Sequence, residues 1–209
     1  MPKKAIIYDL DNTVYPVSSI GEKLFGPLFA IIEESGKHND DMEAIKKAIM
    51  RTPFKLVAKR FNFSDELTQK GIELQTNLEY KDEIKTFDDY PEILNIPGNR
   101  FLVTTGFPVM QHSKITAMNI REDFNEIHVV DPVTTNNTKK DVFADILQRY
   151  NYTADEVIVV GDDPESEIAA AKALGITTVL YDKYSHQEQD LADYTIKHFK
   201  ELKDIYLNS

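Results

Sequence analysis

The residues best suited to chemistry are two aspartates, Asp9 and Asp11, which directly follow the apolar run Ala5–Tyr8. Such a run is typical of a strand buried on both faces of a parallel sheet, and ligands bind where the strands of these sheets end. Two carboxylates this close repel each other, so both ionise readily only beside a cation, and Mg²⁺ is the natural oxygen-seeking partner. The alternative for an isolated acidic pair is a plain turn with Asn12 and Thr13 as capping residues.

A second polar group follows the apolar run Phe101–Val103. Thr104 offers a hydroxyl, and the backbone amides of Thr105 and Gly106 are free to bind the oxygens of a phosphoryl group. Taken alone, this short segment is better explained as an ordinary transition from strand to turn.

Two lysines lie at the start of a predicted helix. Thr138 and Asp141 form a capping-box pattern, which places Lys139 and Lys140 in the first helical turn. Cations there oppose the helix dipole, so one of them could be kept to neutralise a bound phosphate. Two solvated surface lysines are the simpler explanation for such a pair.

A second acidic group follows the valine-rich run Val157–Val160. Pro164 suits the first position of a helix, and Asp163 is then a good N-cap for that helix. Asp162 lies one residue earlier, at the strand end, and has no such structural role. It is therefore the better candidate for a metal ligand.

These groups need a sheet that brings the ends of their strands together. Further continuous apolar runs occur at 101–103, 127–130, 157–160 and 177–180. Helical periodicity separates them, as in the apolar stripe of Phe143, Ile146 and Tyr150. Strand and helix in alternation over the second half of the chain predict a doubly wound α/β core with a parallel, Rossmann-like sheet.

The region before that core has a different pattern. Leu24, Leu28 and Ile32 lie on one helical face, Ile45 and Ile49 on another, and no strand-like run occurs there. We predict a small helical cap domain of about four helices at residues 15–87, inserted into a catalytic core of residues 1–14 and 88–209.

Composition narrows the function classes. The 209 residues include 42% hydrophobic and 28% charged residues, as expected for a globular core with a small insertion. The net charge of −11 argues against a nucleic-acid partner, and no apolar run is long enough to cross a membrane. With no cysteine, disulfides and thiolate sites are excluded, which agrees with a cytoplasmic location. The oligomeric state is not readable from the sequence.

Together these motifs resemble those of the haloacid dehalogenase superfamily of phosphohydrolases, over nearly the whole chain. YDLDNT at Tyr8–Thr13 resembles motif I of this superfamily, and LVTTG at Leu102–Gly106 resembles motif II. The lysine of TKKDVF at Thr138–Phe143 resembles the lysine of motif III, and VVGDDPESEI at Val159–Ile168 resembles motif IV. Gln111 and Lys114 also fit the stretch after motif II, and the helical insertion is similar to the C1-type cap of the superfamily.

The resemblance implies a role for each matching residue. Asp9 attacks phosphorus and forms an aspartyl phosphate, while Asp11 protonates the leaving oxygen and then activates water. Thr104 and Lys139, with Thr105 and Gly106 beside Thr104, bind the phosphoryl oxygens. The metal is Mg²⁺, held by Asp9, the backbone carbonyl of Asp11 and Asp162. Glu167 replaces the usual aspartate, so its contact with the metal is expected through water.

The resemblance leaves several alternatives open. Lys139 is preferred to Lys140 as the phosphate-binding lysine because its spacing to Phe143 fits better. The expected substrate is a small phosphate monoester, such as a nucleoside monophosphate, suggested by the segment Asp11–Pro16, or a sugar phosphate. Phosphoryl transfer resembling that of β-phosphoglucomutase and a non-catalytic binding protein of the same fold are the competing functions. Dehalogenation is disfavoured by the presence of both Asp11 and Asp162.

Overall fold

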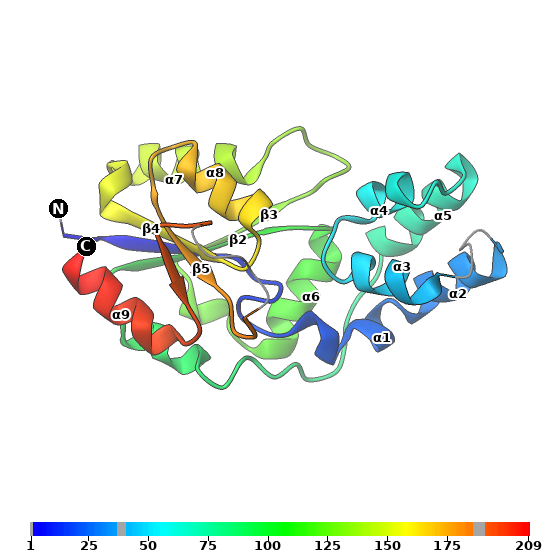
Figure 1. Cartoon of the computed structure of the whole chain (residues 1–209), viewed down its shortest axis with the longest axis horizontal. Helices are drawn as coiled ribbons and strands as arrows, with labels where there is room; N and C mark the ends of the chain where they lie inside the picture. The colour runs from blue at the N-terminus through cyan, green and yellow to red at the C-terminus, as the bar shows by residue number, and fades with distance from the viewer. Residues whose placement is uncertain (1, 37–40, 186–190) are drawn as a thin grey trace.

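A single sheet of parallel strands organises the protein, as the computed structural model shows for residues 2–36, 41–185 and 191–209 (Figure 1). In the described residues the strand order is β3-β2-β1-β4-β5-β6. The strands are β1 (Ala5–Tyr8), β2 (Asn99–Thr105), β3 (Glu126–Val130), β4 (Val157–Gly161), β5 (Thr177–Tyr181) and β6 (Tyr194–Ile196). This arrangement confirms the predicted doubly wound α/β fold, and each predicted apolar run lies in a strand.

Alternate residues of the central strands face two different layers of helices. Ile6 and Tyr8 of β1 pack into the apolar cluster under α6 (Pro108–Met118) and α9 (Phe199–Asn208). Ala5 and Ile7 of the same strand pack against the opposite layer. That layer consists of α7 (Lys139–Tyr150) and α8 (Ala169–Lys172), on the other side of the sheet in Figure 1. Burial on both faces explains why the two central strands β1 and β4 carry no charged residue.

The segment between β1 and β2 is helical, as predicted, but it contains one more helix in its described part than the four expected. The helices are α1 (Gly21–Leu24), α2 (Gly26–Glu34), α3 (Met42–Ile49), α4 (Phe54–Arg60) and α5 (Asp65–Thr76). They lie to one side of the sheet, at the right of Figure 1. One segment connects β1 to these helices and another connects them to β2. The two segments are joined by a hydrogen bond of 2.9 Å from the Phe87 amide to the Val14 carbonyl.

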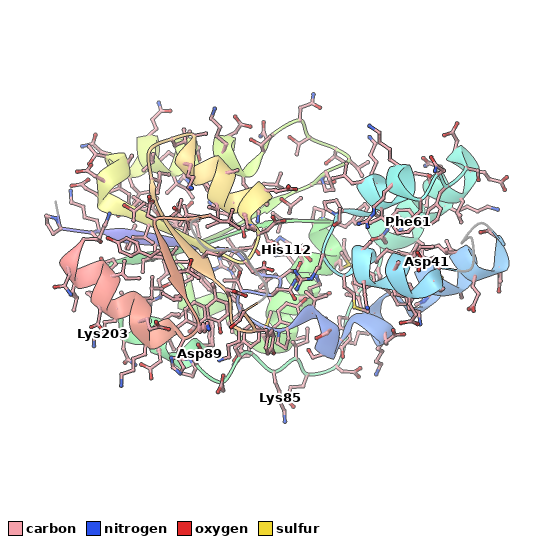
Figure 2. The ribbon with its side chains drawn as sticks, viewed as in Figure 1. Asp41, Phe61, Lys85, Asp89, His112 and Lys203 are labelled. Atoms are coloured by element: carbon pink, nitrogen blue, oxygen red, sulfur yellow. The ribbon has the colours of Figure 1, made fainter. Side chains whose placement is uncertain are left out.

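A short 3₁₀ helix, Tyr90–Asn95, precedes β2. Just before it, buried Asp89 accepts hydrogen bonds from the Tyr181 hydroxyl at 2.9 Å and from the Phe199 amide at 2.9 Å. Lys183 donates a third bond to Asp89 at 3.0 Å. Figure 2 shows Asp89 beside the start of α9. One carboxylate therefore ties β5, α9 and the entry to β2 together.

No helix in the described part of the chain combines the length and the apolar character that a membrane crossing needs.

Candidate active site

The carboxyl ends of β1, β2 and β4 open into one cavity of about 880 Å³. Because the strands are parallel and adjacent, the residues that follow them meet at the same edge of the sheet. Helices α3, α4 and α5 supply the facing wall. All the site residues predicted from the sequence line this cavity: Asp9, Asp11, Thr104, Thr105, Gly106, Lys139 and Asp162.

Lys139 is the central cation of the site. It is the first residue of α7, where the predicted capping box of Thr138 and Asp141 is present. Its ammonium group lies 2.6 Å from Asp9 Oδ1 and 2.7 Å from Glu167 Oε2, and all three side chains are buried. Lys140 is exposed and does not line the cavity. The structure thus places Lys139, the lysine preferred from spacing, beside the predicted nucleophile.

Three carboxylates gather around this lysine. Asp9, Asp162 and Glu167 each have a carboxylate oxygen within 4.8 Å of the others. Burial raises the pKa of Asp9 to about 7, even though the charge of Lys139 opposes the rise. Burial and the neighbouring charge of Asp9 raise the pKa of Asp162 to about 9. One lysine does not balance the charge of three clustered carboxylates, so the cluster favours a further cation.

Glu167 reaches the cluster through an unusual turn. Pro164–Ile168 forms one π-helical turn ahead of α8, and Asp163 caps it by accepting a hydrogen bond from the Glu165 amide at 2.9 Å. Glu167 Oε1 accepts from the Asp163 amide at 2.8 Å. Gly161 makes room for this side chain, because a Cβ there would lie 2.1 Å from Glu167 Oε1. Asp163 is therefore a helix cap, as predicted, and Glu167 belongs to the carboxylate cluster itself.

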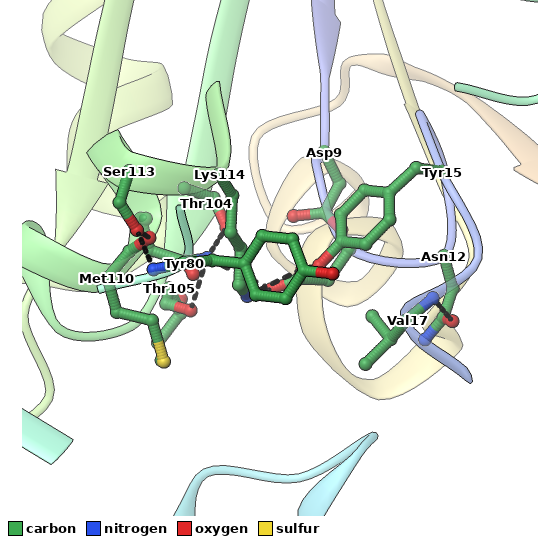
Figure 3. Close-up of polar contacts among 12 residues, drawn as sticks. Asp9, Asn12, Tyr15, Val17, Tyr80, Thr104, Thr105, Met110, Ser113 and Lys114 are labelled. Atoms are coloured by element: carbon green, nitrogen blue, oxygen red, sulfur yellow. Dashed lines mark hydrogen bonds and ion pairs between the residues drawn. The ribbon is translucent and has the colours of Figure 1, made fainter. Parts of the chain in front are cut away.

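The side chain of Asp11 is held by three donors. Lys114 Nζ lies 2.9 Å from Oδ1, Gln111 Nε2 lies 3.0 Å from Oδ2, and the Tyr15 hydroxyl donates to Oδ1 at 2.5 Å. Lys114 comes from α6 and Tyr15 from the loop after β1, and both are labelled in Figure 3. Burial favours the neutral acid, but the Lys114 charge and the three hydrogen bonds outweigh it, so the pKa of Asp11 lies below its usual range. Asp11 is thus held as a carboxylate.

The turn after β2 forms another part of the cavity wall. Buried Thr104 accepts a hydrogen bond of 2.7 Å from Gln111 Nε2, the group that also contacts Asp11. A Cβ on Gly106 would lie 2.9 Å from the side chain of Gln111, so a small residue is needed there. Gln111 therefore links the turn after β2 to the loop after β1.

Three participants in this network were not predicted as site residues from the sequence. Tyr15 had no signal, because an isolated tyrosine in a turn is uninformative. Gln111 and Lys114 fitted the family pattern, but nothing in their spacing indicated contact with Asp11, about one hundred residues earlier.

A parallel α/β sheet with a buried Asp–Lys pair and a carboxylate cluster at its carboxyl edge defines a Rossmann-like hydrolase. The family model of haloacid dehalogenase-like hydrolases matches residues 3–175. The chain therefore belongs to the haloacid dehalogenase-like hydrolase family, and the resemblance noted from the sequence is confirmed.

Curated relatives match this chain over almost its whole length. A glyceraldehyde 3-phosphate phosphatase of Methanocaldococcus jannaschii is 26% identical, over 98% of this chain and 97% of its own. A ribulose-1,5-bisphosphate 5-phosphatase of Halopiger xanaduensis is 22% identical, over 96% and 98%. The crystal structure of a phosphatase of the same superfamily from Thermococcus onnurineus superposes with a TM-score of 0.65 at 19% identity, covering 97% of both chains. The family match and the curated relatives confirm that the chain is a phosphohydrolase, and the solved structure confirms the fold.

Proposed function

We propose that this protein is an Mg²⁺-dependent phosphatase that hydrolyses a small phosphate monoester through an aspartyl-phosphate intermediate on Asp9. The observation that supports it best is the position of Asp9 at the end of β1, with Lys139 Nζ 2.6 Å from Oδ1. Carboxylates form covalent intermediates of this kind when a cation and hydrogen bonds hold them in place.

In the first step the Asp9 carboxylate attacks phosphorus and the bond to the ester oxygen breaks. Lys139 orients Asp9 and offsets the negative charge on the transferring group, and Thr104 contributes a hydroxyl. The backbone amides of Thr105 and Gly106 are the further donors available in this wall. The leaving oxygen takes a proton, and water then displaces Asp9 from phosphorus.

Asp11 is the acid and base of this scheme. Held as a carboxylate by Lys114, Gln111 and Tyr15, it is ready to remove a proton from the attacking water. To act as the acid, Asp11 must first carry a proton, and the same three donors disfavour this protonated form. The contacts of Asp11 therefore support the base step more directly than the acid step.

The donor set fits a magnesium ion. Asp9, Asp162 and Glu167 provide clustered hard oxygens, and the Asp11 backbone carbonyl is a further candidate ligand. When bound, Mg²⁺ neutralises charge on the phosphoryl oxygens. A matched pair of variants tests this site. Asp162→Asn should lose the rise in Tm that Mg²⁺ gives the wild type, while Glu165→Gln, an exposed acid of the same turn, should keep it.

The two curated relatives are named as phosphatases of glyceraldehyde 3-phosphate and of ribulose 1,5-bisphosphate, which are both sugar phosphates. This supports a sugar phosphate, rather than a nucleoside monophosphate, as the substrate. Residues 15–87 then act as the cap that covers the substrate, and 1–14 with 88–209 as the catalytic core. The cysteine-free sequence supports a cytoplasmic location for this reaction.

The test uses p-nitrophenyl phosphate, which carries one phosphate and no sugar. We expect Mg²⁺-dependent release of inorganic phosphate, stopped by EDTA, and a loss in Asp9→Asn of at least about a thousandfold. Wild-type turnover in Asp9→Asn excludes the covalent route. Isomerisation of a sugar phosphate without phosphate release favours the mutase alternative, and no turnover with any ester favours a binding protein.

A further inference from the structure

The wall of the cavity formed by α3, α4 and α5 is mostly apolar, but it also carries an arginine. Ile49, Met50, Phe54 and Ile72 line this wall. Arg51, in the turn between α3 and α4, also lines it, and within the described residues its guanidinium has neither a hydrogen bond nor an ion pair. An arginine usually forms paired hydrogen bonds when a carboxylate or phosphate is within reach.

The same wall carries a polar side chain that is buried. Gln75 of α5 is only 3% exposed, and it is the sole buried polar side chain in the described part of 15–87. Its amide nitrogen donates to the Gly71 carbonyl of its own helix at 3.2 Å. Its amide oxygen has no hydrogen-bond partner among the described residues. Because Gln75 also lines the cavity, this oxygen is available to a ligand there.

The charges on the two sides of the cavity are opposite. The sheet edge carries the carboxylates of Asp9, Asp162 and Glu167, and the helical wall carries Arg51. Arg51 and Asp162 line the same cavity, one from the helical wall and the other from the sheet edge. A second anionic group on a substrate is repelled by the sheet edge and attracted by the helical wall.

We propose that Arg51 and Gln75 form a subsite for the leaving part of the substrate, in which Arg51 binds a second anionic group and Gln75 accepts a hydrogen bond from a hydroxyl. The subsite rests on the proposed phosphatase function. It selects hydroxylated phosphate monoesters whose far end carries a carboxylate or a second phosphate. The cavity volume of about 880 Å³ has room for such a molecule as well as the phosphoryl group.

The test compares two matched pairs of esters. In each pair one member has a neutral far end and the other an anionic one: glycerol 3-phosphate with 3-phosphoglycerate, and ribulose 5-phosphate with ribulose 1,5-bisphosphate. We expect the wild type to favour the anionic member of at least one pair by about tenfold or more in kcat/KM. The pair that shows the preference identifies the group as a carboxylate or a phosphate.

Arg51→Ala should remove this preference and leave kcat/KM for p-nitrophenyl phosphate within about twofold of the wild type. Arg60→Ala is the matched control, because Arg60 is an exposed arginine of α4 that does not line the cavity. Gln75→Met, which keeps the side-chain volume, should lower kcat/KM for the hydroxylated esters but not for p-nitrophenyl phosphate. Thermal unfolding checks that each variant is folded.

The outcomes separate this proposal from the general one. The subsite proposal is overturned if the wild type shows no preference in either pair, or if the preference survives in Arg51→Ala. It is also overturned if Lys55→Ala removes the preference, because Lys55 lines the same wall. If the wild type hydrolyses no ester, the phosphatase proposal fails. Calorimetric binding of 3-phosphoglycerate and ribulose 1,5-bisphosphate to Asp9→Asn, with and without Arg51→Ala, then still decides whether Arg51 binds the anion.

Discussion

The ammonium group of Lys114 lies 2.9 and 3.1 Å from the two carboxylate oxygens of Asp11. Lys114 is only 1% exposed, and it extends from α6 towards the loop after β1. The pair therefore links two segments that are far apart in the sequence at the point where the proposed acid and base must be held.

Replacing Lys114 by Met keeps most of its length but leaves the Asp11 carboxylate without a cation. We expect a loss of about 2–3 kcal/mol in the free energy of unfolding, because breaking a buried ion pair from one side is costly. We also expect a fall in kcat with little change in KM. Urea unfolding and steady-state kinetics measure both effects. Lys70→Met, which removes one partner of the exposed pair with Glu66, should change neither. Equal losses in the two variants contradict a special role for Lys114.

Adding a methyl group at Gly161 should displace Glu167 from the carboxylate cluster. The new Cβ would lie 2.1 Å from Glu167 Oε1, which accepts a hydrogen bond from the Asp163 amide, while Lys139 donates to Oε2 of the same carboxylate. For Gly161→Ala we expect a loss of about 1–3 kcal/mol in stability and a much weaker response of Tm to Mg²⁺.

Gly26→Ala is the control, because no atom lies within 4 Å of a Cβ built there, and it lies in the first turn of α2. Its stability should stay the same or rise by about 0.5 kcal/mol. If Mg²⁺ raises the Tm of Gly161→Ala as much as it raises the Tm of the wild type, Glu167 has no role in metal binding.

The buried carboxylate of Asp89 should be important for stability rather than for catalysis. Asp89→Ala leaves the Tyr181 hydroxyl and the Phe199 amide without their acceptor and removes one of the two acceptors of the Lys183 ammonium. We expect a loss of about 3 kcal/mol, measured by urea unfolding, with kcat of the folded protein unchanged. Asp88→Ala should leave stability unchanged, because Asp88 is 83% exposed although it also contacts Lys183. A fall in kcat with normal stability in Asp89→Ala contradicts this division.

Stability in acid should depend on Glu126. Hydrogen bonds from Arg149, Tyr150 and His128 lower the pKa of Glu126 from 4.5 to about 2. A carboxyl group whose pKa is lower in the folded state stabilises that state above its unfolded pKa, and the contribution is lost as the pH falls from 4.5 towards 2. Because Arg149 is partly exposed, we expect the contribution to be only about 1 kcal/mol.

Glu126→Gln should therefore unfold more easily than the wild type at pH 7, and the difference should shrink as the pH falls towards 2. Denaturant unfolding at several pH values measures it. Glu122→Gln is the control, because Glu122 is exposed and has no ion pair or hydrogen bond of its side chain within the described residues. A difference between Glu126→Gln and the wild type that is constant from pH 7 to pH 2 contradicts the assignment.

Much of the sheet was readable from the sequence because its central strands are buried on both faces. Apolar runs of this kind are distinctive, and they located the ends of β1, β2 and β4, where Asp9, Thr104 and Asp162 lie. The strand β6 was missed, because it has only three residues, and Tyr194 and Thr195 of this strand are exposed. A short, partly exposed edge strand has no periodic pattern to recognise.

The partners of the site residues were harder to predict. The contact of Lys114 with Asp11 depends on how α6 packs against the loop after β1, which no local pattern encodes. Glu167 was expected to act through water because the family usually has an aspartate there. Its longer side chain reaches the cluster through the π-helical turn and the space left by Gly161, and both features depend on tertiary packing.

The hydrogen bond between the Phe87 amide and the Val14 carbonyl closes the base of the segment that contains α1–α5. The chain leaves the sheet and returns to it at one point, so this segment is a loop with fixed ends. The entropic cost of closing a loop grows slowly with its length, by about 0.6 kcal/mol for each doubling. Insertions, deletions or a whole replacement within this loop are therefore thermodynamically cheap for the sheet. Natural variation can change the wall that carries Arg51 and Gln75, and with it the choice of ester, while Asp9 and Lys139 stay in place.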